Sequence, residues 1–179
     1  MNILEIFALG VGLSMDAFAA AVCIGLTTKV KFKKILTVGL YFGGFQALMP
    51  LIGYFAASFF SDFFVYGNFL AFVLLCFLGI KSIREAFKKE ECEEIELTTL
   101  KLLSLAVATS IDALAVGGAL AFLQVKIISV VSVIGVVTFI ISMLGVKIGS
   151  AFGIKFRAKA QFIGGVILAL IGFRILFDF

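Results

Sequence analysis

The sequence predicts an all-α membrane protein, a polytopic bundle of six transmembrane helices built as two inverted three-helix repeats. Three observations support this prediction. Of the 179 residues, 63% are hydrophobic and 15% are charged, whereas soluble domains average about 45–50% and about 25%. The charged residues lie mostly between apolar segments that are long enough to cross a bilayer. A short motif around an aspartate occurs twice, once in each half of the chain.

Six apolar segments account for almost the whole chain: residues 3–27, 35–60, 64–83, 100–123, 127–151 and 160–177. A spanning helix needs about 20 mainly apolar residues, so we expect each segment to cross once, with no domain outside the membrane. Six buried helices of a soluble protein would leave too few polar residues to cover them in water. Strands of a β-barrel would alternate with period two, and runs such as 69–80 do not.

Individual segments carry further signals. The first is preceded by no Lys or Arg and its first charge is Glu5, so we expect it to stay as a span rather than to be cleaved as a signal peptide. The second contains the only proline, Pro50, which should kink it. The third and sixth end near Lys81 and Arg174, and the fifth contains Lys147 about one turn from its end. The long stems of these side chains allow them to snorkel to the membrane surface.

The basic residues predict the orientation. Lys and Arg concentrate on the cytoplasmic side of membrane proteins, so we expect a multi-pass protein of the plasma (inner) membrane with both termini outside the cytoplasm. The net charge of +4 then reflects topology, and no nucleic-acid partner is expected. In this orientation twelve of the fifteen basic residues lie in cytoplasmic connections: Lys29, Lys31, Lys33, Lys34, Lys81, Arg84, Lys88, Lys89, Lys101, Lys155, Arg157 and Lys159.

The longest polar stretch separates the two predicted repeats. Residues 1–84 form the first three-helix unit, 85–99 a charged cytoplasmic linker, and 100–179 the second, inverted unit. A charge run of this kind is usually a solvated connection, although its acids could instead collect cations near the cytoplasmic entrance. Cys92 lies in this linker and is expected to be a reduced thiol. The six glutamates of the stretch are Glu85, Glu90, Glu91, Glu93, Glu94 and Glu96.

The internal repeat is clearest around the two aspartates. The sequence LSMDAFA at 13–19 aligns with TSIDALA at 109–115, so the frame Ser-x-Asp-Ala-x-Ala recurs after 96 residues. The same offset takes Gly53 to Gly149. Because each unit has three spans, its second copy enters the membrane from the opposite side. Transporters with such inverted repeats bind their substrate near the midplane and rock one repeat against the other.

Two aspartates near the centres of spans one and four are the principal candidate metal ligands. Asp16 and Asp112 are the only ionisable side chains in the interiors of those spans, and intramembrane carboxylates usually serve a function. Further candidate ligands are Gln46, Ser14, Ser110 and Thr109. Such oxygen ligands suit a hard divalent cation such as Mg²⁺ or Mn²⁺. Because the chain has no His and three scattered Cys, we expect neither a thiolate or imidazole metal cluster nor a disulfide framework.

These residues also allow other interpretations. The two aspartates could be protonated and hydrogen-bonded across helices, and a membrane Ser or Thr often bonds to its own backbone carbonyl. Lys81 and Arg174 occupy matching repeat positions and could gate the pathway instead of snorkelling. An intramembrane aspartyl protease also uses two aspartates, but Asp112 follows Ser110 and Ile111 rather than the Gly-x-Gly frame of those enzymes. An exporter of amino acids or of another cation is the nearer alternative.

Several motifs resemble the bacterial manganese efflux pump family MntP: SMDAFA at 14–19, FQALMPLIG at 45–53, ATSIDALAVG at 108–117 and AFLQV at 121–125. The resemblance extends from Asn2 to the C-terminus. It implies a six-span inner-membrane protein of metal homeostasis that expels Mn²⁺ from the cytoplasm. By similarity, Asp16 and Asp112 match the acids on which transport depends, and Gly25 matches a glycine linked to function. Some members of the family carry an acid where this chain has Gln46.

The predicted activity is secondary ion transport and not enzyme catalysis. Two carboxylates can hold either one divalent cation or two protons, and neither occupant leaves a net charge on the pair. We therefore expect alternating access with proton antiport. The expected partners are the manganese ion, protons and the lipid bilayer; manganese is the transported substrate, and no cofactor is expected.

Overall fold

The computed structural model describes residues 2–27, 31–59, 67–87, 92, 98–123, 125–152 and 155–177. Within these ranges the chain is all-helical, which confirms the predicted fold class. Five of the helices, all except α3, are long and apolar enough to cross a membrane. The helices are α1 (Ile3–Thr27), α2 (Phe32–Ser58), α3 (Gly67–Ala86), α4 (Thr99–Phe122), α5 (Ile127–Phe152) and α6 (Lys155–Phe177).

The helices follow the predicted segments closely and differ mainly at their basic ends. Helix α2 begins at Phe32 rather than at residue 35, and α6 begins at Lys155 rather than at 160. Helix α3 is displaced toward Ala86 and includes Lys81, Arg84 and Glu85. Lys, Arg and Glu are good helix formers, so these helices continue past the apolar sequence that marks the membrane core. Residues 88–91 and 93–97, most of the predicted charged linker, lie outside the described residues.

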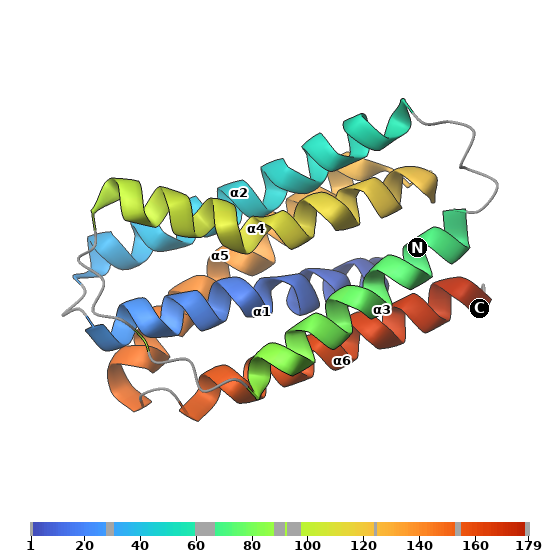
Figure 1. Ribbon diagram of the computed structural model, residues 1–179. Helices are drawn as coiled ribbons and strands as arrows, with labels where there is room; N and C mark the ends of the chain where they lie inside the picture. Colours follow the sequence, from blue (N-terminus) through green and yellow to red (C-terminus); the bar gives the residue numbers. More distant parts are fainter. Residues whose placement is uncertain are drawn as a thin grey trace.

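The helices of the two halves interlock. Helix α1 packs along α5 and α4 packs along α2, so the first helix of each predicted repeat lies against the second helix of the other. Helices α3 and α6 form a third close pair, and α2 also packs against α5. Figure 1 shows this arrangement, with α3 and α6 side by side below α1 and with α2 and α4 on the opposite side.

Glycines permit the closest of these approaches. A Cβ atom added to Gly25 of α1 would collide with the carbonyl oxygen of Val146 on α5, and one added to Gly117 of α4 would collide with the carbonyl of Pro50 on α2. Small residues at such positions let the backbones of membrane helices touch. Helix α2 continues as a helix through Pro50.

The α1–α5 and α2–α4 interfaces are equivalent in the repeat but are offset from each other by one helical turn. Pro50 and Val146 are 96 residues apart, as are the two motif aspartates, but their glycine partners Gly25 and Gly117 are only 92 apart. Relative to the repeated sequence, α1 therefore meets α5 four residues later than α4 meets α2. Four residues correspond to about one turn, or roughly 6 Å along a helix.

Two buried apolar clusters divide the bundle along its length. The first joins α1, α3, α4, α5 and α6 through residues such as Leu9, Leu75 and Leu120. The second joins α1, α2, α4 and α5 around Ile24, Val38 and Val146, and among the described residues it includes no member of α3 or α6. The helices are thus held together near the chain termini, whereas α3 and α6 are outside the apolar core at the other end.

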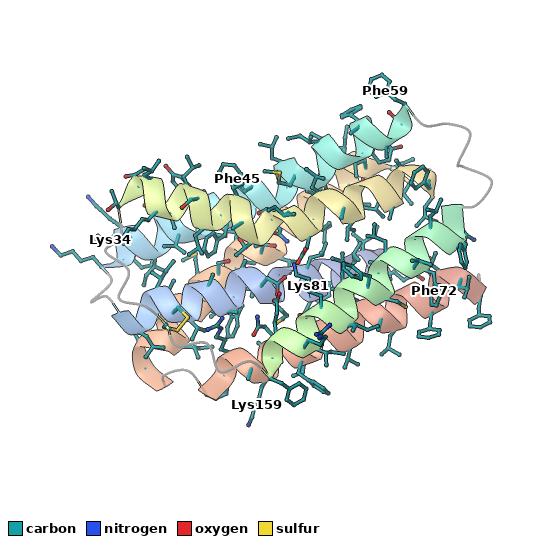
Figure 2. The ribbon with its side chains drawn as sticks, viewed as in Figure 1. Lys34, Phe45, Phe59, Phe72, Lys81 and Lys159 are labelled. Atoms are coloured by element: carbon teal, nitrogen blue, oxygen red, sulfur yellow. A yellow bond between two sulfur atoms is a disulfide. The ribbon has the colours of Figure 1, made fainter. Side chains whose placement is uncertain are left out.

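Two of the basic residues, Lys34 and Lys159, lie at the end of the bundle opposite the termini. The first residues of α1 and the last residues of α6 are at one end, and the C-terminal ends of α1, α3 and α5 are at the other (Figure 1). Lys34 and Lys159 lie toward this second end (Figure 2). At the terminal end, Arg174 of α6 forms a 2.8 Å ion pair with Glu5 of α1.

A disulfide corrects one expectation from the sequence. Cys23 near the end of α1 is bonded to Cys92, although 69 residues separate them, and the scattered cysteines had indicated no disulfide framework and a free thiol at Cys92. The topology explains the pairing, because α3 ends at the same end of the bundle as α1. Cys92, six residues beyond the last residue of α3, therefore lies beside Cys23, and the Cα atoms of the two cysteines are 5.3 Å apart.

Candidate ion-transport site

A cavity of about 450 Å³ lies between helices α1 and α4 on one side and helices α3 and α6 on the other. It extends from the two motif aspartates toward the end of the bundle that holds Cys23. Three carboxyl groups and two basic groups line it. Its lining residues are Asp16, Ala19, Ala20, Cys23, Lys81, Glu85, Cys92, Leu105, Ala108, Thr109, Asp112, Arg157 and Gln161.

Asp16 and Asp112 meet at the closed end of this cavity, the end farthest from Cys23. Their carboxyl groups are close enough to interact directly, although the residues are 96 positions apart in the sequence. Alanines of the same two helices, Ala19, Ala20 and Ala108, line the cavity beside them. Their short side chains leave room for the cavity beside the two carboxyl groups.

The two carboxyl groups have different partners. Both oxygens of Asp112 accept hydrogen bonds from the Nζ atom of Lys81, at 2.8 and 2.9 Å. The Oδ1 atom of Asp16 is buried and has no hydrogen-bond partner among the described residues. The pair therefore combines one carboxylate already neutralised by an ammonium group with one that has an unused oxygen.

Lys81 is the main site residue whose role sequence reasoning left open. Snorkelling was its expected behaviour, but its side chain turns inward from α3 toward α1 and α4 (Figure 2). The sequence did contain a signal for the inward position of Lys81, because Leu78, Lys81 and Glu85 lie on one face of the helix at a spacing of three and four residues. Leu78 is buried and the two charged residues line the cavity, so one face of α3 changes from apolar to charged as it reaches the site.

Gln46 connects the two aspartate helices from behind the cavity. Its Nε2 atom donates a 3.1 Å hydrogen bond to the carbonyl of Leu13 on α1, and its Oε1 atom accepts a 3.1 Å bond from the hydroxyl of Ser110 on α4. Gln46 is only 1% exposed, and it is not among the residues that line the cavity. Its amide thus fixes the spacing of α1 and α4 close to both aspartates.

The three candidate hydroxyl groups bond to backbone carbonyls of their own helices. Ser14 donates to Val11 at 2.9 Å and Ser110 donates to Ala106 at 2.7 Å. Both serines are fully buried and neither lines the cavity. Thr109 does line it, while its hydroxyl lies within bonding distance of the carbonyls of Leu105 and Ala106. The structure thus brings Asp16, Asp112 and Thr109 to the cavity and keeps Ser14, Gln46 and Ser110 behind it.

Gly25 lies outside the cavity. Its close contact with the Val146 carbonyl places it in the interface between α1 and α5, nine residues beyond Asp16. The structure therefore gives this glycine a packing position and not a ligand position. Arg157 and Gln161 of α6, which sequence analysis did not select, complete the cavity wall, and Gln161 is tied to α3 because its carbonyl accepts a 3.0 Å hydrogen bond from Ser82.

The chemistry of the site fits a hard cation held by few charged ligands. Among the residues that the structure describes, no three His, Cys, Asp or Glu side chains form a metal-binding group. A divalent cation would therefore bind the two aspartates together with neutral oxygens from the chain or from water. Mg²⁺ and related hard cations commonly keep several water ligands and use only one or two carboxylates, so two aspartates in a polar cavity suit such an ion.

Comparison with known proteins finds one matching family and relatives that cover nearly the whole chain. Residues 29–176 match the model of the family Mntp, described as "Putative manganese efflux pump". Relatives with the same description, named MntP, include a protein of Acetivibrio thermocellus that is 49% identical over 99% of this chain and 92% of its own. Similar proteins of Desulfitobacterium hafniense and Campylobacter jejuni are 48% and 42% identical, over 99% of this chain and 96% and 97% of theirs. No solved structure matches the chain.

Proposed function

This chain belongs to the manganese efflux pump family MntP, a family of transporters and not of enzymes, and we propose that it exports Mn²⁺ from the cytoplasm. The observation that carries the proposal is the meeting of Asp16 and Asp112 in a polar cavity between α1, α3, α4 and α6. Mn²⁺ is a hard divalent cation for which carboxylate and water ligands are suitable. Manganese is here the transported substrate.

The proposed location is the inner membrane, with both termini outside the cytoplasm. Lys34 and Lys159 lie at the end of the bundle opposite the termini, and basic residues favour the cytoplasmic side. In this orientation the cavity faces the cytoplasm. The apolar cluster around Leu9, Leu75 and Leu120 then closes the pathway on the outer side.

We further propose that transport proceeds by alternating access between two inverted repeats, residues 1–84 and 100–179, joined by the linker 85–99. The moving unit is the pair α3 and α6, because the cavity separates this pair from α1 and α4. The apolar cluster around Ile24, Val38 and Val146 includes neither helix among the described residues. The repeats interlock, so a rigid movement of one whole repeat would break the close α1–α5 and α2–α4 interfaces.

Energetics favour coupling of export to proton entry. Moving Mn²⁺ out against an inside-negative potential costs about 4.6 kcal/mol per 100 mV, which is twice the cost of one charge. Two protons returning on the same carboxylates would make the exchange electroneutral. Export that continues undiminished after the pH gradient is collapsed, with the membrane potential held constant, would contradict this coupling.

The proposed substrate is tested by cytoplasmic metal content. Cells that lack their own manganese exporter are grown in excess Mn²⁺, Mg²⁺, Cd²⁺ or Zn²⁺ and analysed for elements with and without this chain. We expect the chain to lower manganese selectively, and we expect Asp112→Asn at equal membrane abundance to have no effect. Unchanged manganese with wild-type protein in the membrane would contradict manganese export and favour export of another cation or of an amino acid.

A further inference from the structure

We propose that the Lys81 ammonium group is a tethered competitor of the transported cation, occupying Asp112 when that carboxylate holds neither a metal nor a proton and excluding Na⁺ and K⁺ from the site. This inference rests on the proposed function and adds a residue that determines its specificity. The observation behind it is the two-oxygen contact: one Nζ atom bonds Oδ1 and Oδ2 of Asp112 at 2.8 and 2.9 Å.

The contact obstructs metal binding at Asp112. A metal ligated by this carboxylate would lie close to an ammonium group that contacts both of its oxygens, and two cations at such a separation in a low-dielectric cavity repel each other strongly. Charge-assisted hydrogen bonds to a carboxylate are also among the stronger hydrogen bonds in proteins. Lys81 must therefore leave Asp112 before or while the metal binds.

The structure offers the ammonium group another acceptor. Glu85 is one turn further along α3 and lines the same cavity, and residues four apart on a helix are neighbours. The Lys81 side chain is 41% exposed whereas that of Asp112 is 17% exposed, so the long stem has room to swing away from Asp112 toward Glu85. Metal binding at the aspartates then coincides with formation of a Lys81–Glu85 pair.

The tether provides discrimination by charge. Attached to α3, the ammonium group is a monovalent cation at high effective concentration, so a free Na⁺ or K⁺ gains little by replacing it. A divalent ion contacts Asp112 and the unused oxygen of Asp16 at once, and it carries twice the charge. Only such an ion offsets the loss of the Lys81 contact.

The test is calorimetric titration of detergent-purified full-length protein with MnCl₂, in buffers containing about 0.15 M NaCl or choline chloride, near physiological ionic strength. Wild type should bind Mn²⁺ equally in both buffers. Lys81→Met, which keeps a long side chain without the charge, should bind on the order of tenfold more tightly in choline, the effect of losing one charge-assisted contact, and Na⁺ should now weaken its binding. Lys147→Met removes an exposed lysine of α5 and should behave as wild type.

Two further variants make the test independent of the stability of Lys81→Met. Lys81→Arg keeps the cation and adds a second donor nitrogen, so Mn²⁺ should bind more weakly than to wild type and remain insensitive to Na⁺. Glu85→Gln should weaken binding in the wild-type background and have little effect beside Lys81→Met. Unchanged or weaker binding and no Na⁺ effect in Lys81→Met, or unchanged binding in Lys81→Arg, would overturn the proposal.

The results distinguish a failure of the Lys81 proposal from a failure of the proposed manganese transport. If wild type binds Mn²⁺, Asp112→Asn does not, and the Lys81 variants match wild type, the tethered-competitor role is overturned while manganese transport stands. If wild type itself does not bind Mn²⁺, both proposals fail together.

Discussion

Asp16 and Asp112 carry the same sequence motif but have different surroundings. Asp112 is held by Lys81 through both oxygens, and Asp16 has a buried oxygen without a partner among the described residues. An unpaired carboxylate oxygen in a membrane is costly, so its presence beside a polar cavity is best explained by a ligand that arrives from that cavity.

Neutralising either aspartate should abolish export. Asp16→Asn and Asp112→Asn preserve side-chain size but halve the charge available to Mn²⁺. We expect a loss of export larger than the about 10–100-fold that removal of a mere outer-shell partner causes at metal sites, with normal membrane abundance on immunoblots. Export retained by both variants would refute the shared site.

Gln46 should prove to be a structural bridge. Gln46→Leu would remove the two hydrogen bonds that join α1 and α4, one to the carbonyl of Leu13 and one from the hydroxyl of Ser110, and each such bond contributes about 0.5–1.5 kcal/mol of stability. We expect a lower thermal unfolding midpoint in detergent but an unchanged KM for Mn²⁺ in vesicles. A raised KM at unchanged stability would instead identify Gln46 as a metal ligand.

At the level of the helices, backbone contacts at glycines fix the α1–α5 and α2–α4 interfaces. The positions concerned, Gly25 against Val146 and Gly117 against Pro50, have backbone atoms as neighbours. A backbone neighbour cannot rotate away as a flexible side chain can, so an added methyl group must separate the helices.

Alanine at these glycines should therefore destabilise the bundle. We expect Gly25→Ala and Gly117→Ala each to cost about 1–3 kcal/mol, the usual range for overpacking, measured as a lower unfolding midpoint. Gly44→Ala is the matched control, since an added Cβ at Gly44 on α2 meets nothing within 4 Å, and it should be neutral or slightly stabilising because alanine favours helices. Equal effects at all three positions would argue against close packing as the cause.

For the molecule as a whole, the Cys23–Cys92 bond connects α1 to the chain between α3 and α4 at the mouth of the cavity. Figure 2 shows the sulfur–sulfur bond near the end of the bundle that holds the basic residues. In the proposed orientation this end faces a reducing compartment, where thiols are usually maintained. The bond restrains the region through which α3 and α6 would have to move.

Oxidation should accordingly slow transport. We expect export by vesicles containing wild-type protein to decrease after treatment with a thiol oxidant and to recover with dithiothreitol. Cys23→Ser and Cys92→Ser should be insensitive to both reagents, while Cys76→Ser, at the remaining cysteine, should respond as wild type does. Transport unaffected by complete oxidation would show that the Cys23–Cys92 bond does not restrain the movement of α3 and α6.

The fold was largely predictable from sequence because membrane helices are defined by length and apolarity, properties that each segment carries locally. Asp16 and Asp112 could be selected as candidate ligands in the same way, since an intramembrane acid in a repeated frame is conspicuous. Lys81 and the Cys23–Cys92 pair were not, because their partners lie 31 and 69 residues away. Those contacts depend on how α3 packs between its neighbours, which hydropathy does not encode.

The most direct test of manganese transport uses purified protein in liposomes that enclose a dye quenched by Mn²⁺. We predict that wild-type protein carries Mn²⁺ across the membrane, with a rate increased by a pH gradient that drives protons in the opposite direction. Vesicles with Asp112→Asn should behave as protein-free vesicles do. Quenching by wild-type vesicles no faster than in either control would contradict the proposal that the paired aspartates form a manganese transport site.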